Sequence, residues 1–442
     1  MSTCITRELL ATGVAQVIVV LDLRPAAGDE TPTAAGRAVR RNTVAAAADL
    51  ERHFVVSALS QDSALAAAAV ETGAPLGAHR ARRTARRHGT PRGDTGALPP
   101  AARFYPNLGV LLGTVSRDGL AALRADPRVA SISGAPQLSM IWPQRVRAAR
   151  LTRTVTWGVE QLGVPALWKQ GLSGHGVLVG HLDTGADGRH PTLRGAIGAF
   201  ADFDRLGRER RPSPRPYDTD EHGTHTAATI AGRPVAGRAV GVAPGATLAS
   251  AIVIEGGNVV ARVLGGMDWA VGQGVRVLSL SLGFRGWWED FVPLTRILRA
   301  RNILPVFAVG NEGPGTSRSP GNYRQALSIG AVDSAGRVPE FSSSQRFRRK
   351  QDPIVPDLVA PGVDVISARP GSGYQAMDGT SMATPHIAGL AALLFEAKPD
   401  ATEDEVERAI LQSCRRGPNL SRERANRGAP EGQRALAALV GA

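Results

Sequence analysis

Residues 176–185, GVLVGHLDTG, carry the pattern that decides the fold. Their apolar run is nearly continuous and ends at Asp183. Three later stretches repeat the pattern, namely 274–283 (GVRVLSLSLG), 302–311 (NILPVFAVGN) and 326–332 (ALSIGAV). Such runs are typical of strands covered on both faces, and Ala-rich helical stretches separate them. From Trp157 onward we therefore predict an α/β fold with a mostly parallel, doubly wound sheet.

Reactive side chains stand at the ends of these strands or at the helix starts that follow, where parallel sheets gather functional groups. Asp183 and Asn311 end two strands. His222 opens a helix in DEHGTHTAATIAG (220–232), and Ser381 opens another in DGTSMATPHIAG (378–389). Each alone reads as a turn former or a helix cap. Together, an acid, an imidazole and a hydroxyl predict an activated serine nucleophile, because serine needs a base and the base needs an orienting carboxylate.

Three blocks in this order resemble the subtilisin-like serine proteases, the subtilase family: HLDTGAD (181–187), HGTHTA (222–227) and GTSMATPHIAG (379–389). The blocks HPTLRG, GVAPGATL, LSLSLG and AVGNEG agree as well, so the resemblance covers roughly residues 152–415. It implies a serine endopeptidase that hydrolyses peptide bonds. Asp183 would orient His222, His222 would be the general base and then acid, Ser381 would attack, and Asn311 would stabilise the oxyanion.

The resemblance also implies a substrate-binding edge and a specificity pocket. Ser281, Leu282 and Gly283 match the segment that holds substrate as an added β-strand. Gly310 and Glu312 would line the S1 pocket, which receives the residue before the cleaved bond. Arg318 falls near the floor of that pocket. An inward guanidinium would favour acidic side chains there, and the alternative is an arginine that faces solvent.

No cofactor or metal is expected to be required. Many relatives carry a calcium loop after the histidine helix, but here GRPVAGRAVGVAP (232–244) has only Arg233 and Arg238 as charged residues. Two arginines repel cations, so calcium is not supported at this loop, although structural calcium elsewhere stays open. His225 and His386 match residues that the family uses structurally.

Residues 1–133 are predicted to form a separate, small α+β sandwich. A strand at 14–23 and a helical stretch come first, followed by an Arg-rich insert at 77–100. A strand (104–115), a helix (116–126, with Ser116 or Asp118 near its N-cap) and a strand (127–133) complete the domain. This order resembles the inhibitory propeptide of the family. It implies a self-inhibited zymogen whose N-terminal domain is its own inhibitor and folding chaperone; the alternative is a permanent accessory domain.

Residues 134–151 read as a linker between this domain and a protease domain at 152–442. In a zymogen this linker would pass through the active site. Self-cleavage is then expected near Met140 or Ile141, or closer to Leu151.

The net charge and the lengths of the apolar runs limit which partners the chain can have. The formal net charge of +13 comes from scattered arginines without a nucleic-acid motif, so we predict protein or peptide substrates and no nucleic acid. The basic stretches QRFRRK (345–350) and 77–100 are either solvated surface or docking sites for an acidic substrate. No apolar run approaches the roughly 20 residues of a membrane span.

Cys4 and Cys414 form no disulfide framework, which fits a reducing compartment. The N-terminus lacks the features of a signal peptide, so a cytoplasmic protein is expected. A dedicated intracellular processing protease is the favoured role. The alternatives are a secreted scavenging protease with an unrecognised export signal and a non-catalytic scaffold that binds peptides.

Overall fold

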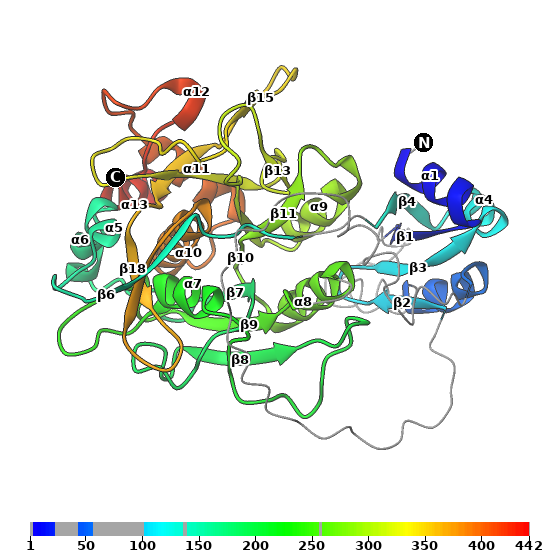
Figure 1. The fold of residues 1–442 in the computed structure, drawn as a ribbon, viewed down its shortest axis with the longest axis horizontal. Coiled ribbons are helices and arrows are strands. Elements are labelled where there is room, and N and C mark those ends of the chain that lie inside the picture. The colour runs from blue at the N-terminus through cyan, green and yellow to red at the C-terminus, as the bar shows by residue number, and fades with distance from the viewer. Residues whose placement is uncertain (1–2, 23–42, 56–100, 136–138, 256–258, 442) are drawn as a thin grey trace. The chain divides into compact units, whose positions relative to one another are not determined.

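The computed structural model describes residues 3–22, 43–55, 101–135, 139–255 and 259–441 (Figure 1). The predicted Arg-rich insert at 77–100 lies outside these ranges. By its internal contacts the chain divides into two compact units, residues 1–104 with 111–134, and residues 105–110 with 135–442. No helix among the described residues is long and apolar enough to cross a membrane.

The first unit is built on a four-stranded sheet in the order β2-β3-β1-β4. The strands are β1 (Val14–Leu21), β2 (Ala102–Tyr105), β3 (Val110–Ser116) and β4 (Val129–Gly134). The helical segments are α1 (Thr3–Thr12), residues 43–50, η1 (Glu51–His53) and α4 (Arg117–Ala125). Ser116 is the N-cap of α4, because its Oγ accepts a hydrogen bond of 3.2 Å from Gly119 N.

The single strand predicted at 104–115 is wrong. The chain forms two neighbouring strands instead, with β2 ending at Tyr105 and β3 beginning at Val110. Pro106 fixes its own backbone and lacks an N–H, and Gly109 takes a φ of +65°. Both features favour a turn over a continuous strand.

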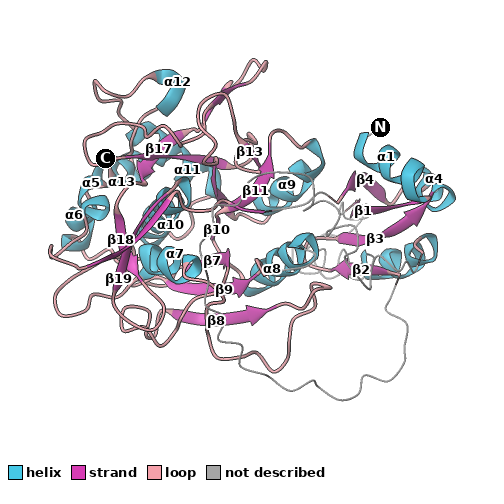
Figure 2. Cartoon of the chain, in the orientation of Figure 1, coloured by secondary structure: helices cyan, strands magenta, loops and turns pink. Residues whose placement is uncertain are grey.

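The second unit contains a seven-stranded sheet in the order β17-β14-β12-β10-β7-β9-β8, and its strand pairs are parallel. Its strands are β7 (Leu178–Asp183), β8 (Ile197–Asp202), β9 (Thr247–Ile252), β10 (Val277–Leu280), β12 (Leu304–Ala308), β14 (Leu327–Val332) and β17 (Leu358–Pro361). Every residue of β10, β12, β14 and β17 is buried. Because side chains alternate between the faces of a strand, both faces of the sheet are covered. The predicted parallel α/β architecture is confirmed (Figure 2).

Helices α7 and α10 pack against each other, and α10 crosses β10, β12, β14 and β17. Helices α8 and α9 pack against β7, β9 and β12. The helices of this unit are α5 (Trp157–Gln161), α6 (Val164–Lys169), α7 (His222–Ala231), α8 (Val259–Gln273), η3 (Glu289–Phe291), α9 (Val292–Ala300), α10 (Thr380–Ala397), α11 (Glu403–Ser413), α12 (Arg422–Ala425) and α13 (Gly432–Val440).

Three small sheets complete the second unit, in the orders β13-β11-β5, β15-β16 and β18-β19-β6. Their strands are β5 (Ser139–Met140), β6 (Arg145–Ala149), β11 (Leu282–Arg285), β13 (Arg318–Ser319), β15 (Gln345–Arg346), β16 (Ile354–Val355), β18 (Val365–Ala368) and β19 (Tyr374–Asp378). The segment predicted as a linker therefore contributes two strands, each paired antiparallel with an edge of this unit.

Candidate active site

Asp183 and His222 meet at the carboxyl end of the parallel sheet. Asp183 is the last residue of β7, His222 is the first residue of α7, and both side chains are buried. His222 Nδ1 lies 2.7 Å from Asp183 Oδ1. Burial alone would lower the pKa of His222, but the charge and hydrogen bond of Asp183 outweigh it and raise that pKa. The carboxylate thus fixes the ring and stabilises its protonated form.

A half-buried carboxylate that no motif indicated holds the start of α7. Asp218 Oδ2 accepts hydrogen bonds of 2.6 Å from both N and Oγ1 of Thr224, and Oδ1 accepts one of 2.7 Å from Thr184 Oγ1. These bonds join the end of β7 to the first turn of α7 and place His222 beside Asp183. The signal in the sequence is an aspartate shortly before a helix start, where a carboxylate can accept free N–H groups.

A second histidine, His181, lies near Asp183 from within β7 itself. Its Nδ1 is 3.0 Å from Ser250 Oγ, and its Nε2 is 2.8 Å from Thr226 Oγ1. Burial lowers the pKa of His181 to about 4, so this ring is neutral at neutral pH. His222 is consequently the imidazole that takes up a proton beside Asp183.

Ser381 is the second residue of α10, whose residues 380–395 are buried. Its hydroxyl donates a hydrogen bond of 2.8 Å to the carbonyl oxygen of Ile141. His222 Nε2 is buried and has no hydrogen-bond partner among the described residues. The structure therefore brings Asp183 and His222 into contact and turns the Ser381 hydroxyl toward a backbone carbonyl.

Asn311 follows β12, and Thr380 orients its side-chain amide. Asn311 Oδ1 accepts hydrogen bonds of 2.9 Å from both N and Oγ1 of Thr380. With the oxygen fixed in this way, Nδ2 donates to the carbonyl oxygen of Trp142 at 2.9 Å. An oriented amide N–H beside the start of α10 is suited to stabilise an oxyanion.

Residues 139–141 lie against β11 as an antiparallel strand. Met140 pairs with Leu282 and Ser139 pairs with Gly283. One step further along, the N–H of Ile141 donates to the carbonyl oxygen of Ser281 at 3.1 Å. The three residues predicted to hold a substrate strand thus hold a strand of the chain itself, and that strand leads to Ser381.

Comparison with known proteins agrees with this geometry. Residues 174–432, more than half of the chain, match the model of the subtilase family. The chain belongs to the subtilase family.

Three relatives show what the chain is similar to. The M-protease of Shouchella clausii (strain KSM-K16) is 34% identical over 312 residues, which cover 70% of this chain and 75% of the relative. Subtilisin Savinase of Lederbergia lenta is 37% identical over 264 residues, 59% of this chain and 92% of the relative. An intracellular serine protease of Paenibacillus polymyxa is 35% identical over 285 residues, 61% and 83% of the two chains. The chain is a subtilisin-like serine endopeptidase, and its substrates are proteins or peptides.

In this subtilase, Arg318 turns inward beside the predicted pocket residues Gly310 and Glu312. Arg318 is 5% exposed, so the solvent-facing alternative is wrong. Its Nε donates to Glu312 Oε1 at 2.8 Å, and its Nη1 donates to Ser139 Oγ at 2.9 Å and to the Gly283 carbonyl oxygen at 3.2 Å. Glu312 therefore offsets the charge that would favour an acidic residue in the pocket. Gly310 has a φ of +122°, and a Cβ there would lie 2.7 Å from the Glu312 carboxylate.

His225 and His386, which match structural residues of the family, bond to backbone carbonyls. His225 Nε2 lies 2.9 Å from the Val365 carbonyl oxygen, and His386 Nδ1 lies 2.8 Å from the Met382 carbonyl oxygen. Burial lowers the pKa of His225 to about 3 and that of His386 to about 4. The neutral His225 ring thus joins α7 to β18, and the neutral His386 ring is bonded within α10.

In the loop after α7, backbone carbonyls bind an arginine. Arg233 Nη1 donates to the carbonyl oxygens of Ala231 (3.0 Å), Ala246 (2.8 Å) and Pro244, and Nη2 donates to that of Gly195 at 3.2 Å. Calcium binds such oxygens, so the guanidinium already uses the ligands that a cation would need. The residues present do not fit calcium at this loop. In the described ranges no group of three or more His, Cys, Asp or Glu side chains could hold a metal.

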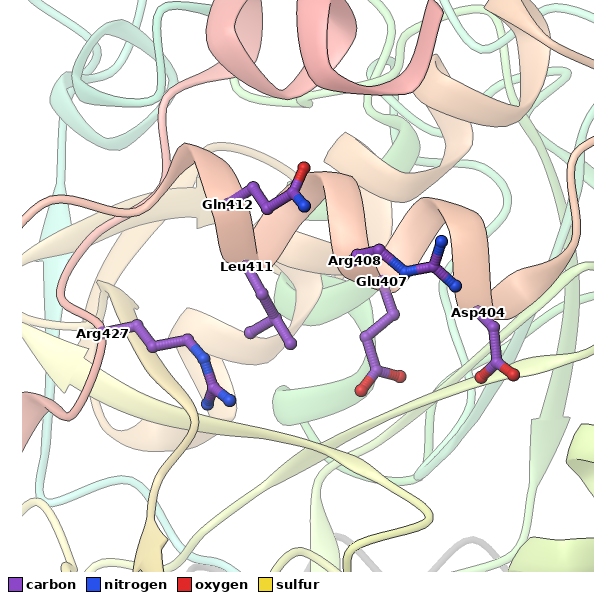
Figure 3. A pocket seen from close by; sticks show the side chains of 6 residues that line it. All are labelled: Asp404, Glu407, Arg408, Leu411, Gln412 and Arg427. Carbon is purple, nitrogen blue, oxygen red and sulfur yellow. The ribbon is translucent and has the colours of Figure 1, made fainter. Parts of the chain in front are cut away.

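A separate hollow lies along α11 (Figure 3). It is lined by Asp404, Glu407, Arg408, Leu411 and Gln412 of α11 and by Arg427, which follows α12. Three of its four charged side chains are already paired, because Arg299 binds Asp404 at 3.0 Å and also Glu407, and Arg427 binds Asp352 at 2.9 Å. The hollow contains none of the predicted site residues, and its ion pairs connect elements of the second unit.

Proposed function

We propose that Asp183, His222 and Ser381 are the catalytic triad, and that the chain is a self-inhibited zymogen whose residues 139–142 occupy the substrate position. The strand on β11 carries this proposal, because its Ile141 carbonyl accepts a hydrogen bond from the Ser381 hydroxyl. A peptide held along this edge and leading to the nucleophile is bound as a substrate would be.

We propose a step for each group. Ser381 Oγ attacks the carbonyl carbon while its proton passes to His222 Nε2, the nitrogen without a partner among the described residues. Asp183 stabilises the imidazolium that forms. Asn311 Nδ2 and the Ser381 N–H stabilise the oxyanion, and His222 then gives the proton to the leaving amine. Water attacks the acyl-enzyme by the same route and regenerates Ser381.

The bond between Ile141 and Trp142 is the one that we assign to self-cleavage. The Ile141 N–H binds the last carbonyl of the binding edge, that of Ser281, and its own carbonyl faces Ser381. The next bond, from Trp142 to Pro143, is less suited to cleavage. Its leaving group is a proline, whose nitrogen carries no hydrogen and is part of a ring.

In the uncut chain Ser381 and Asn311 contact two successive carbonyls, those of Ile141 and Trp142. For the reaction, the same carbonyl must lie next to the Ser381 hydroxyl, which attacks it, and next to Asn311, which stabilises its oxygen. The Ile141 carbonyl must therefore shift toward Asn311 Nδ2 before attack. We propose that this offset slows self-cleavage and makes residues 139–142 inhibitory as well as cleavable.

In the sequence the N-terminal unit ends shortly before this strand, since β4 ends at Gly134 and β5 begins at Ser139. We propose that residues 1–141 are the inhibitory propeptide. Its removal after cleavage distinguishes this role from that of a permanent accessory domain, which would stay bound to the protease unit on a size-exclusion column.

We also propose a role as an intracellular processing protease, which one of the relatives supports. One relative at 35% identity is named an intracellular serine protease. The buried free thiol of Cys414 does not bear on this choice, because burial raises its pKa to about 12 and makes it unreactive in either compartment. Cell fractionation that finds the mature enzyme outside the cell would support the secreted scavenging role instead.

The decisive test replaces the nucleophile. The Ser381→Ala chain should keep its full mass and lose labelling by a fluorophosphonate probe, whereas the Ser213→Ala chain, changed at an exposed serine, should behave as wild type. Continued cleavage of the Ser381→Ala chain at the same bond would rule out the triad. A wild-type chain that neither cuts itself nor reacts with the probe, even after proteolytic removal of residues 1–141, would favour the non-catalytic scaffold.

A further inference from the structure

Beyond β11 the surface carries an exposed aromatic ring that the catalytic arrangement does not use. Trp287 follows β11 by two residues and is 46% exposed. Its ring packs nearly perpendicular to Tyr323 at 5.2 Å and lies 5.5 Å from Phe347. A large ring that stays accessible while both neighbours fix its position is suited to bind a partner.

The basic stretch 345–350, QRFRRK, lies next to this ring through Phe347. It begins with β15, which pairs with β16 in a hairpin. Along the stretch, exposure alternates: Phe347 and Arg349 are half-buried, whereas the exposed side chains are the cations Arg346, Arg348 and Lys350. The three cations are therefore accessible together within residues 346–350. None of the three has an ion-pair partner among the residues that the structure describes.

Arg349 fixes the hairpin in place. Its Nη1 donates to the Asn322 carbonyl oxygen at 3.2 Å, its Nε donates to the Asp352 carbonyl oxygen at 2.7 Å, and its guanidinium lies 4.9 Å from the centre of the Phe347 ring. The carboxylate of Asp352 is already paired with Arg427 at 2.9 Å. The exposed cations of the hairpin are therefore not neutralised by the acid on the same turn.

We propose that Trp287, Phe347, Arg346, Arg348 and Lys350 form an aromatic–cationic shelf that binds an acidic segment of the protein substrate, on the amino-terminal side of the cleaved bond. The shelf continues the edge that already holds a peptide. Ser139 lies opposite Gly283, and β11 runs antiparallel to the bound strand. Because β11 ends at Arg285, two residues before Trp287, a substrate that extends beyond the position of Ser139 along this edge runs toward the Trp287 side of the strand.

Such a site selects substrates without touching the reacting bond. Its contacts form equally in the ground state and the transition state, so they lower KM and leave kcat unchanged. Because the cations are exposed, the preference for acidic segments falls as salt is added. The inference rests on β11 as the substrate strand, which the proposed function also uses.

The test compares three peptides that share the residues Ser-Met-Ile before the cleaved bond. Each carries, five to nine residues upstream of that bond, one Phe with three Glu, three Gln or three Lys. With the full-length protein after it has become active, the Glu peptide should show roughly fivefold higher kcat/KM than the Gln peptide, all of it in KM. The triple change Arg346→Gln, Arg348→Gln, Lys350→Gln should abolish this difference, and Trp287→Ala should raise KM for all three peptides.

A matched control removes three exposed arginines elsewhere, Arg408→Gln, Arg416→Gln and Arg434→Gln, and should keep the full preference. Equal kcat/KM for the Glu and Gln peptides would overturn the proposal. So would an equal loss in the control, which would reduce the effect to net charge.

A second measurement does not require catalysis. A fluorescein-labelled Phe-Glu-Glu-Glu peptide should bind the full-length Ser381→Ala chain by fluorescence anisotropy and should lose binding in the shelf triple variant. Because this arm needs no cleavage, it separates failure of the shelf from failure of the triad. A single-stranded oligonucleotide that binds tighter than the acidic peptide would show that the shelf recognises nucleic acid, contrary to the proposal.

Discussion

Residues 139–149 cross the protease unit as two strands that are held in different ways. β5 lies on β11, and its end is buried, with Met140 at 2% exposure and Ile141 at 0%. β6 pairs with β19 over five residues, but nearly all of its side chains are exposed. Its main side-chain contact is the exposed ion pair between Arg147 and Asp364 at 2.9 Å.

The difference shows where inhibition resides. Burying one large aliphatic side chain stabilises by about 1.5–3 kcal/mol, whereas an exposed ion pair contributes about 0–1 kcal/mol. The β5 half therefore holds the chain in the cleft, and the β6 half mainly guides the segment that follows. Four experiments test this difference between the β5 half and the β6 half.

The largest effect should come from the oxyanion donor beside the β5 half. Asn311→Leu should slow self-cleavage roughly hundred- to thousandfold, since one such donor contributes about 2.7–4 kcal/mol to the transition state. Mass spectrometry of timed samples measures the rate. Asn419→Leu, at an exposed asparagine, is the control. A loss of less than tenfold for Asn311→Leu would mean that its contact with Trp142 is only structural.

The second largest effect is expected from Ile141, the buried side chain that follows β5. In the chain that keeps Ser381 and has not yet cut itself, Ile141→Ala should raise the initial rate of hydrolysis of a short peptide at least tenfold. Truncating a buried aliphatic side chain lowers stability by about 2–5 kcal/mol, so the strand should leave the cleft more often. Freshly purified protein with a chromogenic peptide gives the rate. An unchanged initial rate would mean that the strand is held by its backbone alone.

The pH dependence should follow His222. The imidazole must be neutral to accept the serine proton, and Asp183 raises its pKa above the ordinary value of about 6.5. Self-cleavage should therefore accelerate as pH rises through this raised pKa and fall about tenfold for each pH unit below it. The negative charge of Asp218 also raises that pKa, so Asp218→Asn should shift the midpoint to lower pH. A rate that increases on acidification would contradict the role of His222 as base.

The smallest effect is expected in the β6 half. Arg147→Ala should change the initial hydrolysis of the same short peptide less than twofold, because the lost ion pair is exposed and screened. A change as large as that of Ile141→Ala would erase the contrast between the two halves.

The same contrast separates what the sequence predicts from what it does not. The parallel sheet and the places of Asp183, His222, Asn311 and Ser381 follow from buried apolar runs and from motifs at their ends. β5 and β6 have no such pattern, because they are stabilised by backbone pairing with existing edges, and exposed side chains such as those of Arg145–Ala149 need no period.

The sequence left two other features wrong or undecided, each for its own reason. The turn at 106–109 lies inside an apolar stretch, so the hydrophobic pattern suggested one strand although the proline and glycine there favour a reversal. The inward turn of Arg318 depends on Glu312 and on carbonyl and hydroxyl groups brought together only by folding. Tertiary hydrogen bonds of this kind leave no local signal.

The most direct test of the account is the identity of the first residue of the protease fragment. When the purified full-length chain becomes active, N-terminal sequencing and intact mass of the large fragment should give Trp142 as its first residue, because Ile141 is the residue whose carbonyl faces Ser381. A fragment that begins at Pro143 or beyond Leu151, or full activity from a chain that remains uncut, would contradict the assignment of residues 139–142 to the substrate position.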